Sequence, residues 1–249
     1  MEVEGSLPEG DAVAVIGSRR ASLAGIGMAR RLGAELASEG IVVVSGGAIG
    51  IDSAALEGVL SAGGLAVVVL PTGVREPLPR RNLRLFEDLV RAGGALVAEA
   101  GVSLSRSAFL RRNRLIAAFS HVVVVVEAAE RSGTRATVTA ARALERPVGA
   151  VPWAPDDPGG AGCLAILRSG GHVVADLADV AKLLGRRIEP RQARDRHPIL
   201  HELSLARGDA ALLASRRGTS VERVLAELGG LEIEGVLRRE GSRWLENRP

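Results

Sequence analysis

The sequence has few of the residues that build disulfide frameworks, metal sites or membrane spans. Its 249 residues include one cysteine, no tyrosine, three phenylalanines and two tryptophans. Cys163 cannot form a disulfide within the chain, and no His or Cys stands near it at metal-ligand spacing. Apolar runs such as Val122–Val126 are interrupted within a few residues, far short of the roughly 20 that a membrane span needs. We therefore expect neither a disulfide-built domain nor a contact with the membrane.

The first eleven residues also lack the features of a secretory signal. They are acidic and contain Gly and Pro, without a basic start or an apolar stretch. We expect residues 1–11 to form an N-terminal tail and the protein to be cytoplasmic.

Several catalytic and cofactor motifs are missing as well. The histidines are scattered, and His197 and His201, although spaced i,i+4, are separated by Pro198 and complete no zinc pattern. The first strand-to-helix turn lacks the Gly-x-Gly-x-x-Gly pattern of dinucleotide-binding proteins, and there is no Walker loop and no Gly-x-Ser-x-Gly elbow. The sequence predicts no metal, no cofactor and no catalytic residue.

Positive charge is local rather than general. The formal net charge is +3, and residues 1–185 hold 19 basic and 19 acidic side chains. Arginines nevertheless cluster at positions 75–84 and again at 106–114, where no acid occurs from Gly101 to Ser120. Such clusters are candidate phosphate contacts, so any anion site in this part of the chain should be a local one.

Short apolar runs alternate with helical patterns over most of the chain. The expected strands are 12–16, 41–44, 65–70, 95–98, 121–126, 148–151 and 172–174. Continuous hydrophobicity indicates strands that are buried on both faces of a parallel sheet. Residues 12–185 are therefore predicted to form an α/β domain with a Rossmann-like, doubly wound, mostly parallel sheet. Ligands of such sheets bind beyond the carboxyl ends of the strands.

The last quarter of the chain has a different pattern. Residues 186–197 are rich in Arg and contain Pro190, with Pro198 directly after them, which indicates a linker. Residues 198–249 then show two short helical stretches and a hairpin signal at Gly241-Ser242, a winged-helix-like order. The second helix has Arg223 beside Glu222 and Glu227, which suits a DNA groove poorly, so a DNA contact and a protein contact both stay open.

Two glycine-rich turns follow the first two expected strands. Their backbone amides can approach an anion closely, and Arg19 adds charge. The candidate phosphate-binding residues here are Gly17, Ser18, Arg19, Ser45, Gly46, Gly47 and Gly50.

Further candidates follow the later strands. They are Arg80, Asn82, Phe109, Arg111, Asn113, Arg114, Ser132 and Gly133. Phe109 could stack on a base or pack in the core, and Ser132 could donate to a ligand or cap a helix.

Three carboxylates stand at strand ends, namely Asp52, Glu99 and Glu127. Acid–base catalysis on a nucleotide would need carboxylates placed in this way. Asp52 and Glu127 can equally fix their loops by accepting backbone N–H bonds, and we expect them to be structural.

The ordered set of motifs resembles the DNA-processing A (DprA/Smf) family. The motifs are Gly-Ser-Arg at 17–19, Ser-Gly-x-x-x-Gly-Ile-Asp at 45–52, Thr-Gly at 72–73, Pro-x-x-Asn at 79–82, Arg-Arg-Asn-Arg-x-Ile-Ala at 111–117, Val-Val-Glu-Ala at 125–128 and Ser-Gly-Thr at 132–134. The resemblance runs from about Val13 to Leu184. It implies a homodimer that binds single-stranded DNA at these loops without cleaving it and helps to load a RecA-type recombinase during natural transformation.

The sequence also departs from the family pattern. Ile49 stands where the family usually has Arg, Leu56 where it has His, and Gly162-Cys163-Leu164 where it has Gly-Thr-Asn. The N-terminal helical domain of longer members is not found, so we expect a short or divergent member. A nucleotide-binding sensor and a phosphoribohydrolase-like enzyme of the same fold superfamily remain the alternatives.

Overall fold

The computed structural model describes residues 1–101, 105–130, 132–186, 199, 202–203, 206, 208–233 and 237–246. The chain divides into two compact units, residues 1–188 and 189–249. Nearly all of the expected linker, 186–197, lies outside the described residues.

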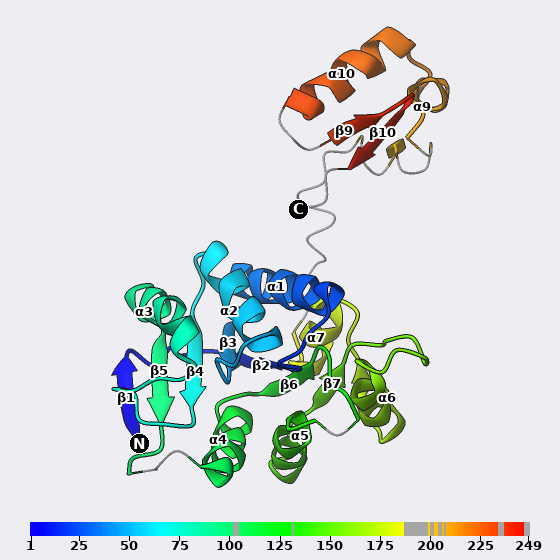
Figure 1. Cartoon of the computed structure of the whole chain (residues 1–249). Helices are drawn as coiled ribbons and strands as arrows, with labels where there is room; N and C mark the ends of the chain where they lie inside the picture. Colours follow the sequence, from blue (N-terminus) through cyan, green and yellow to red (C-terminus); the bar gives the residue numbers. More distant parts are fainter. Residues whose placement is uncertain are drawn as a thin grey trace. The chain divides into compact units, whose positions relative to one another are not determined.

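Unit 1 is built on one eight-stranded sheet (Figure 1). Its strands are β1 (Glu2–Gly5), β2 (Ala12–Ile16), β3 (Val42–Ser45), β4 (Ala66–Leu70), β5 (Ala95–Ala98), β6 (Val122–Val125), β7 (Val148–Ala150) and β8 (His172–Val173). The spatial order is β1-β5-β4-β3-β2-β6-β7-β8, and every pair is parallel except β1 with β5. The predicted Rossmann-like sheet is confirmed. Strand β1 lies within residues 1–11, where the sequence predicted only a tail, and it pairs with β5 along the edge.

Helices cover both faces of the sheet. They are α1 (Leu23–Ser38), α2 (Ile51–Ser61), η1 (Arg80–Asn82), α3 (Leu83–Arg91), α4 (Arg106–Ala118), α5 (Thr134–Ala143), α6 (Ala161–Arg168) and α7 (Leu177–Leu183). Val13 and Val15 of β2 pack with α1, α2, α3 and α7, whereas Ala14 and Ile16 pack with α4, α5 and α6. Figure 1 shows the same two layers on either side of the strands. Burial on both faces explains why the strands read as continuous apolar runs.

Strand β2 occupies the topological switch point of the sheet. Its neighbours are β3 on one side and β6 on the other. The chain winds outward from β2 in both directions, so the loops after β2 and β6 diverge and leave a crevice at the carboxyl edge. This edge carries the motifs singled out in the sequence.

Unit 2 contains α9 (Ala210–Arg217), α10 (Val221–Ile233), β9 (Leu237–Glu240) and β10 (Arg243–Glu246). The two strands form an antiparallel hairpin in which Trp244 pairs with Arg239. Leu213, Val224 and Trp244 belong to one buried cluster. The order of helix, helix and hairpin is the expected one.

No helix among the described residues is long and apolar enough to cross a membrane.

Candidate functional site

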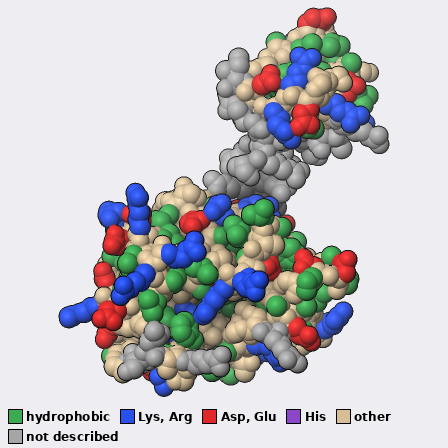
Figure 2. Space-filling model, viewed as in Figure 1, with side chains coloured by type: hydrophobic (Ala, Val, Ile, Leu, Met, Phe, Trp, Pro, Cys, Tyr) green, Lys and Arg blue, Asp and Glu red, His purple; other side chains and the backbone are tan. Residues whose placement is uncertain are grey.

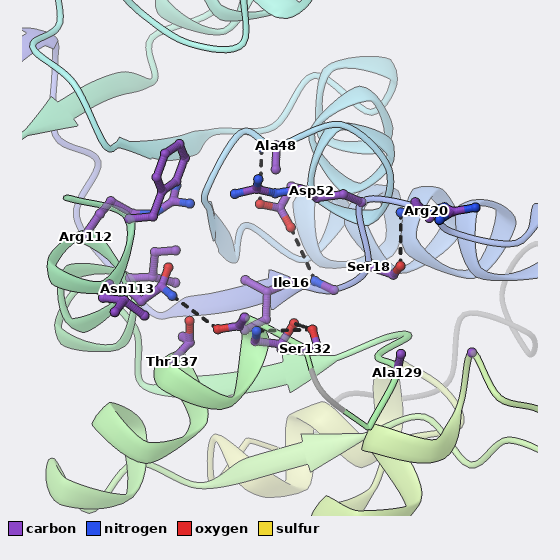
Figure 3. Close-up of a pocket in the computed structure, with 18 of the residues that line it drawn as sticks. Ile16, Ser18, Arg20, Ala48, Asp52, Arg112, Asn113, Ala129, Ser132 and Thr137 are labelled. Atoms are coloured by element: carbon purple, nitrogen blue, oxygen red, sulfur yellow. Dashed lines mark hydrogen bonds between the residues drawn. The ribbon is translucent and has the colours of Figure 1, made fainter. Parts of the chain in front are cut away.

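A cavity of about 930 Å³ opens at the switch point (Figure 3). The loop after β2 provides one wall, α4 a second, and the start of α5 a third. Residues 158–159, which precede α6, complete the lining. The cavity lies where a doubly wound sheet binds its ligands, and its volume is in the range of small-molecule and nucleotide sites.

Two buried charged side chains, Asp52 and Arg112, support the loops around the cavity. The carboxylate of Asp52, in the first turn of α2, accepts bonds from the backbone N–H groups of Gly17 and Ala48, both at 3.3 Å. The Nη1 of Arg112, in α4, donates to the carbonyl oxygens of Gly46 and Val69, both at 2.5 Å. Two side chains therefore tie together the loops that follow β2 and β3 and the end of β4.

Burial dominates the electrostatics of this pair. It raises the pKa of Asp52 above the ordinary 3.8, more than the nearby Arg112 and the two backbone bonds lower it. It lowers the pKa of Arg112 to about 10, against the opposing effect of Asp52. Arg112 therefore carries its charge at neutral pH, and its buried Nε has no hydrogen-bond partner within the protein.

Arg19 and Phe109 face each other across the cavity. The guanidinium carbon of Arg19 lies 5.0 Å from the centroid of the Phe109 ring, a cation–π distance. Arg19 is exposed and Phe109 is half-buried. An exposed cation held against an aromatic face can contact a phosphate while the ring contacts a base. Phe109 lines the cavity and is absent from the two buried clusters of unit 1, which favours the stacking role over core packing.

Hydroxyl and amide groups form the opposite wall. The hydroxyls of Ser132 and Thr134 lie 2.8 Å apart, and the backbone N–H of Thr134 donates to Ser132 Oγ at 3.2 Å. The side-chain amide of Asn113 donates to the carbonyl of Gly133 at 3.3 Å. Ser132 thus acts in part as a local cap, and α4 holds the first turn of α5 in place.

Glu127 supports the cavity from behind its lining. Its carboxylate accepts two bonds of 3.1 Å from the backbone N–H of Ser22 and one of 2.6 Å from the Ser22 hydroxyl. Its own carbonyl accepts a bond of 2.7 Å from the N–H of Ser18. Ser22 in turn caps α1 by accepting from the N–H of Gly25 at 3.0 Å. These are the contacts of a loop-fixing residue, as they are for Asp52.

The predicted binding residues divide into two groups. Those that line the cavity are Gly17, Ser18, Arg19, Phe109, Asn113, Ser132 and Gly133. Those outside its lining are Ser45, Gly46, Gly47, Gly50, Arg80, Asn82, Arg111 and Arg114.

The second group has mainly structural contacts. Ser45 donates to the carbonyl of Val15 at 2.8 Å, and Asn82 donates to the carbonyl of Gly47 at 3.0 Å. Arg114 pairs with Glu99 at 2.6 Å, and its side chain is about half exposed. Ser45, Asn82 and Arg114 thus hold strands and loops in place, while Gly50 and Asn82 also line a smaller neighbouring cavity.

Helix geometry divides the polar residues of α4. Arg111 and Arg114 lie on the exposed side of α4, whereas Arg112 and Asn113 are buried against the sheet. Arg111 and Arg114 remain predicted binding residues outside the cavity, and Arg112, which lines it, was not predicted. The signal was available, because Arg112 stands four residues before Ile116, and residues four apart share one face of a helix. Thr137, one turn into α5, lines the cavity and was missed in the same way.

Two of the three departures from the family pattern lie away from the cavity. Leu56 is fully buried in the cluster under α2, and Cys163 is fully buried in the cluster on the opposite face. Neither side chain lines the cavity at the switch point. Ile49 lines a smaller neighbouring cavity.

The charged groups on the visible face of unit 1 are dispersed (Figure 2). Lys and Arg side chains alternate there with acidic and hydrophobic ones. This distribution agrees with the prediction of a local rather than a general anion site.

Comparison with known sequences identifies one family. The family model "DNA recombination-mediator protein A" matches residues 3–185. A "Putative DNA processing protein DprA" of Mycobacterium tuberculosis is 36% identical over 94% of this chain and 64% of that protein. "Protein Smf" of Escherichia coli is 37% identical over 69% of this chain and 46% of that protein. The chain thus spans less than two thirds of the length of these curated relatives.

Solved structures agree with the sequence comparison. DNA processing protein A from Streptococcus pneumoniae superposes with a TM-score of 0.63 at 33% identity, over 72% of this chain and 62% of that one. A Helicobacter pylori structure, whose description concerns a single-stranded DNA binding mode of DNA processing protein A, gives 0.61 at 25% identity, over 75% and 82%. A molybdenum cofactor carrier protein from Chlamydomonas reinhardtii, at 24% identity and 0.52, over 72% and 100%, shares the fold alone.

Proposed function

The chain belongs to the DNA recombination-mediator protein A family, and from this premise we propose that it binds single-stranded DNA at the switch-point cavity. The DNA is bound without chemical change. The single observation that carries the proposal is Arg19 held over Phe109 beside a cavity lined with backbone amides and hydroxyls. Every base has a face that stacks on an aromatic ring and every nucleotide has a phosphate, so this pair suits a strand of any sequence. The Helicobacter pylori relative, described as binding single-stranded DNA, supports the same ligand class.

The carboxylates support binding without catalysis. Asp52 and Glu127 accept backbone hydrogen bonds that fix loops, and Glu99 pairs with Arg114. A carboxylate engaged in this way is poorly placed to move a proton on a substrate. We therefore propose a binding protein rather than a nucleotide hydrolase.

The proposal is tested by fluorescence anisotropy with labelled oligo-dT of about 30 nucleotides, a length chosen to exceed one binding site. We expect tight binding that weakens with salt, weaker binding to a duplex of the same length, and much weaker competition by thymidine monophosphate. Equal affinity for the monophosphate and the oligonucleotide would instead support the nucleotide-sensor alternative. Release of base or sugar from either ligand would support the hydrolase alternative.

Arg19→Ala locates the site. Removal of one phosphate contact should weaken binding to all sequences alike and reduce the slope of log affinity against log salt by about 1. Arg91→Ala is the matched control, because Arg91 ends α3 and so lies at the amino edge of the sheet. Equal slopes for the two variants would place the DNA elsewhere on the protein.

We also propose that the protein acts as a homodimer that helps to load a RecA-type recombinase during natural transformation. The support is family membership and relatives named as DNA processing proteins. Sedimentation measures the dimer directly. Recombinase filament formation on strands already coated with this protein tests the loading role, and a filament rate no higher than on uncoated strands would contradict it.

A further inference from the structure

A second cavity, of about 330 Å³, adjoins the one at the switch point. The two share Arg19 and Arg20, which follow β2 and line both. From these residues the second cavity extends between α1, α2 and η1, on the side away from α4 and α5. The loop after β2 therefore separates the two cavities and contributes residues to both.

The lining of the second cavity combines cations with an apolar wall. Its other two arginines are Arg30 and Arg81, against a single acid, Glu57, which pairs with Arg30 at 2.5 Å. Ile26, Ile49 and Ala54 provide the apolar part. Apolar side chains can pack against a base, and exposed arginines can contact its phosphate. The volume lies at the lower end of the range of small-ligand sites.

The partition between the two cavities is rigid. The N–H of Ile51 donates to the carbonyl of Ser18 at 3.1 Å, which joins the loop after β2 to the start of α2. At Gly50, with φ of 90°, an added Cβ would lie 2.3 Å from the same carbonyl oxygen, so the contact admits only glycine. Close backbone contacts between the loop after β2 and the start of α2 thus fix the distance between the two cavities.

We propose that the second cavity takes a neighbouring nucleotide of the same DNA strand and makes binding depend on strand length. The inference rests on the proposed function and extends it. A mononucleotide fills one hollow, whereas an oligonucleotide that crosses Arg19 and Arg20 fills both. The second hollow adds its binding energy only when the ligand is long enough to reach it.

The test is a length series of oligo-dT, from the mononucleotide to about 30 nucleotides, measured by anisotropy competition against wild type and two variants. Arg81→Ala removes a cation from the second cavity. Arg84→Ala removes an exposed cation only three residues away that is absent from the lining of either cavity. We expect Arg81→Ala to weaken the longer oligonucleotides about tenfold, equivalent to about 1.4 kcal/mol, and to leave the shortest unchanged. Arg84→Ala should match wild type at every length.

Ile49→Arg provides the opposite change. A further cation among the four arginines of this lining should tighten binding of the longer oligonucleotides and steepen their salt dependence, with no gain for the mononucleotide. Ile49 is half-buried, so thermal unfolding of each variant shows whether the protein still folds with an arginine at this position. Because Arg81 is exposed, its replacement keeps the test valid even if Ile49→Arg unfolds.

The outcomes separate the two proposals. Suppose Arg19→Ala weakens binding but Arg81→Ala and Arg84→Ala behave alike at every length. The proposal that the second cavity binds a nucleotide is then wrong, and the proposed function stands. If wild type binds no oligonucleotide at all, both are wrong.

Discussion

The two edges of the sheet in unit 1 are stabilised by different kinds of interaction. The described side chains that are both buried and charged, Asp52, Arg112 and Glu127, all lie at the carboxyl edge. At the amino edge, turns such as those at Gly40 and Gly93 close with backbone bonds, from each glycine N–H to the carbonyl three residues before it. A buried charge costs free energy unless it is paired and hydrogen-bonded, whereas a glycine turn needs no side chain at all.

This difference shows which edge is shaped for a ligand. Long loops at the carboxyl edge leave room for two cavities, and buried polar side chains hold those loops in one conformation. The short turns at the amino edge only reverse the chain. Stability should therefore be far more sensitive to polar substitutions at the carboxyl edge.

Asp52→Ala should give the largest loss of stability. It removes the charged acceptor of the Gly17 and Ala48 N–H groups, where each hydrogen bond to a charged group contributes about 1.5–3 kcal/mol, and it removes the negative charge that acts on the buried Arg112. Asp88→Ala is the matched control, because Asp88 pairs with Arg91 at the surface, where such pairs contribute about 0–1 kcal/mol. Urea unfolding of both variants measures the contrast. Equal losses would remove the distinction between the two edges.

The pH dependence of stability tests the same carboxylate. Burial raises the pKa of Asp52 above 3.8 in the folded state, so just above pH 3.8 the folded protein keeps a proton that the unfolded chain has released. The Asp52 contribution to the free energy of unfolding therefore falls as pH rises from 3.8 through the raised pKa, by at most about 1.4 kcal/mol per pH unit. Asp52→Asn should remove this contribution. An unchanged pH profile in denaturant titrations would show that the carboxylate is not buried as described.

Glu127→Ala should have an intermediate effect. It removes the charged acceptor of the N–H and the hydroxyl of Ser22 at the start of α1, and a hydrogen bond to a charged group contributes about 1.5–3 kcal/mol, less at Ser22 because that residue is exposed to water. Glu87→Ala, on the exposed side of α3, should change stability by less than about 0.5 kcal/mol. A Glu127→Ala protein as stable as the Glu87→Ala protein would show that Ser22 finds other partners.

The sequence predicted the strands that support the site better than the side chains that line it. Every expected strand in unit 1 is present, because apolar β-branched runs bounded by glycine leave little choice of structure. Strand β1 was missed because Glu2–Gly5 is an edge strand with exposed residues and none of the apolar pattern of a buried one. The position of β1 depends on its pairing with β5, about 90 residues later in the chain, and the local sequence of β1 does not reveal that pairing.

The contents of the site depend on which way each side chain points. Four consecutive polar residues at 111–114 share one motif, yet two face solvent and two are buried. The motif locates the helix beside the cavity, but the side that faces inward is set by packing against β4 and α5. Similarly, Ser45 belongs to a motif near the site and bonds the backbone beneath it, whereas Asn82 bonds the backbone and also lines the second cavity.

Gly40→Ala is expected to have the smallest effect on DNA binding, which would mark the amino edge as structural only. Gly40 has a φ of +68° and nothing within 4 Å of an added Cβ, so the cost is conformational, about 1–2 kcal/mol. Oligo-dT affinity should remain at the wild-type value, because the turn lies across the sheet from both cavities. Gly46→Ala is the counterpart at the carboxyl edge, where an added Cβ would lie 2.4 Å from Nη1 of Arg112 and displace it. If Gly40→Ala weakens DNA binding as much as Gly46→Ala does, the amino edge takes part in binding and the division between the edges fails.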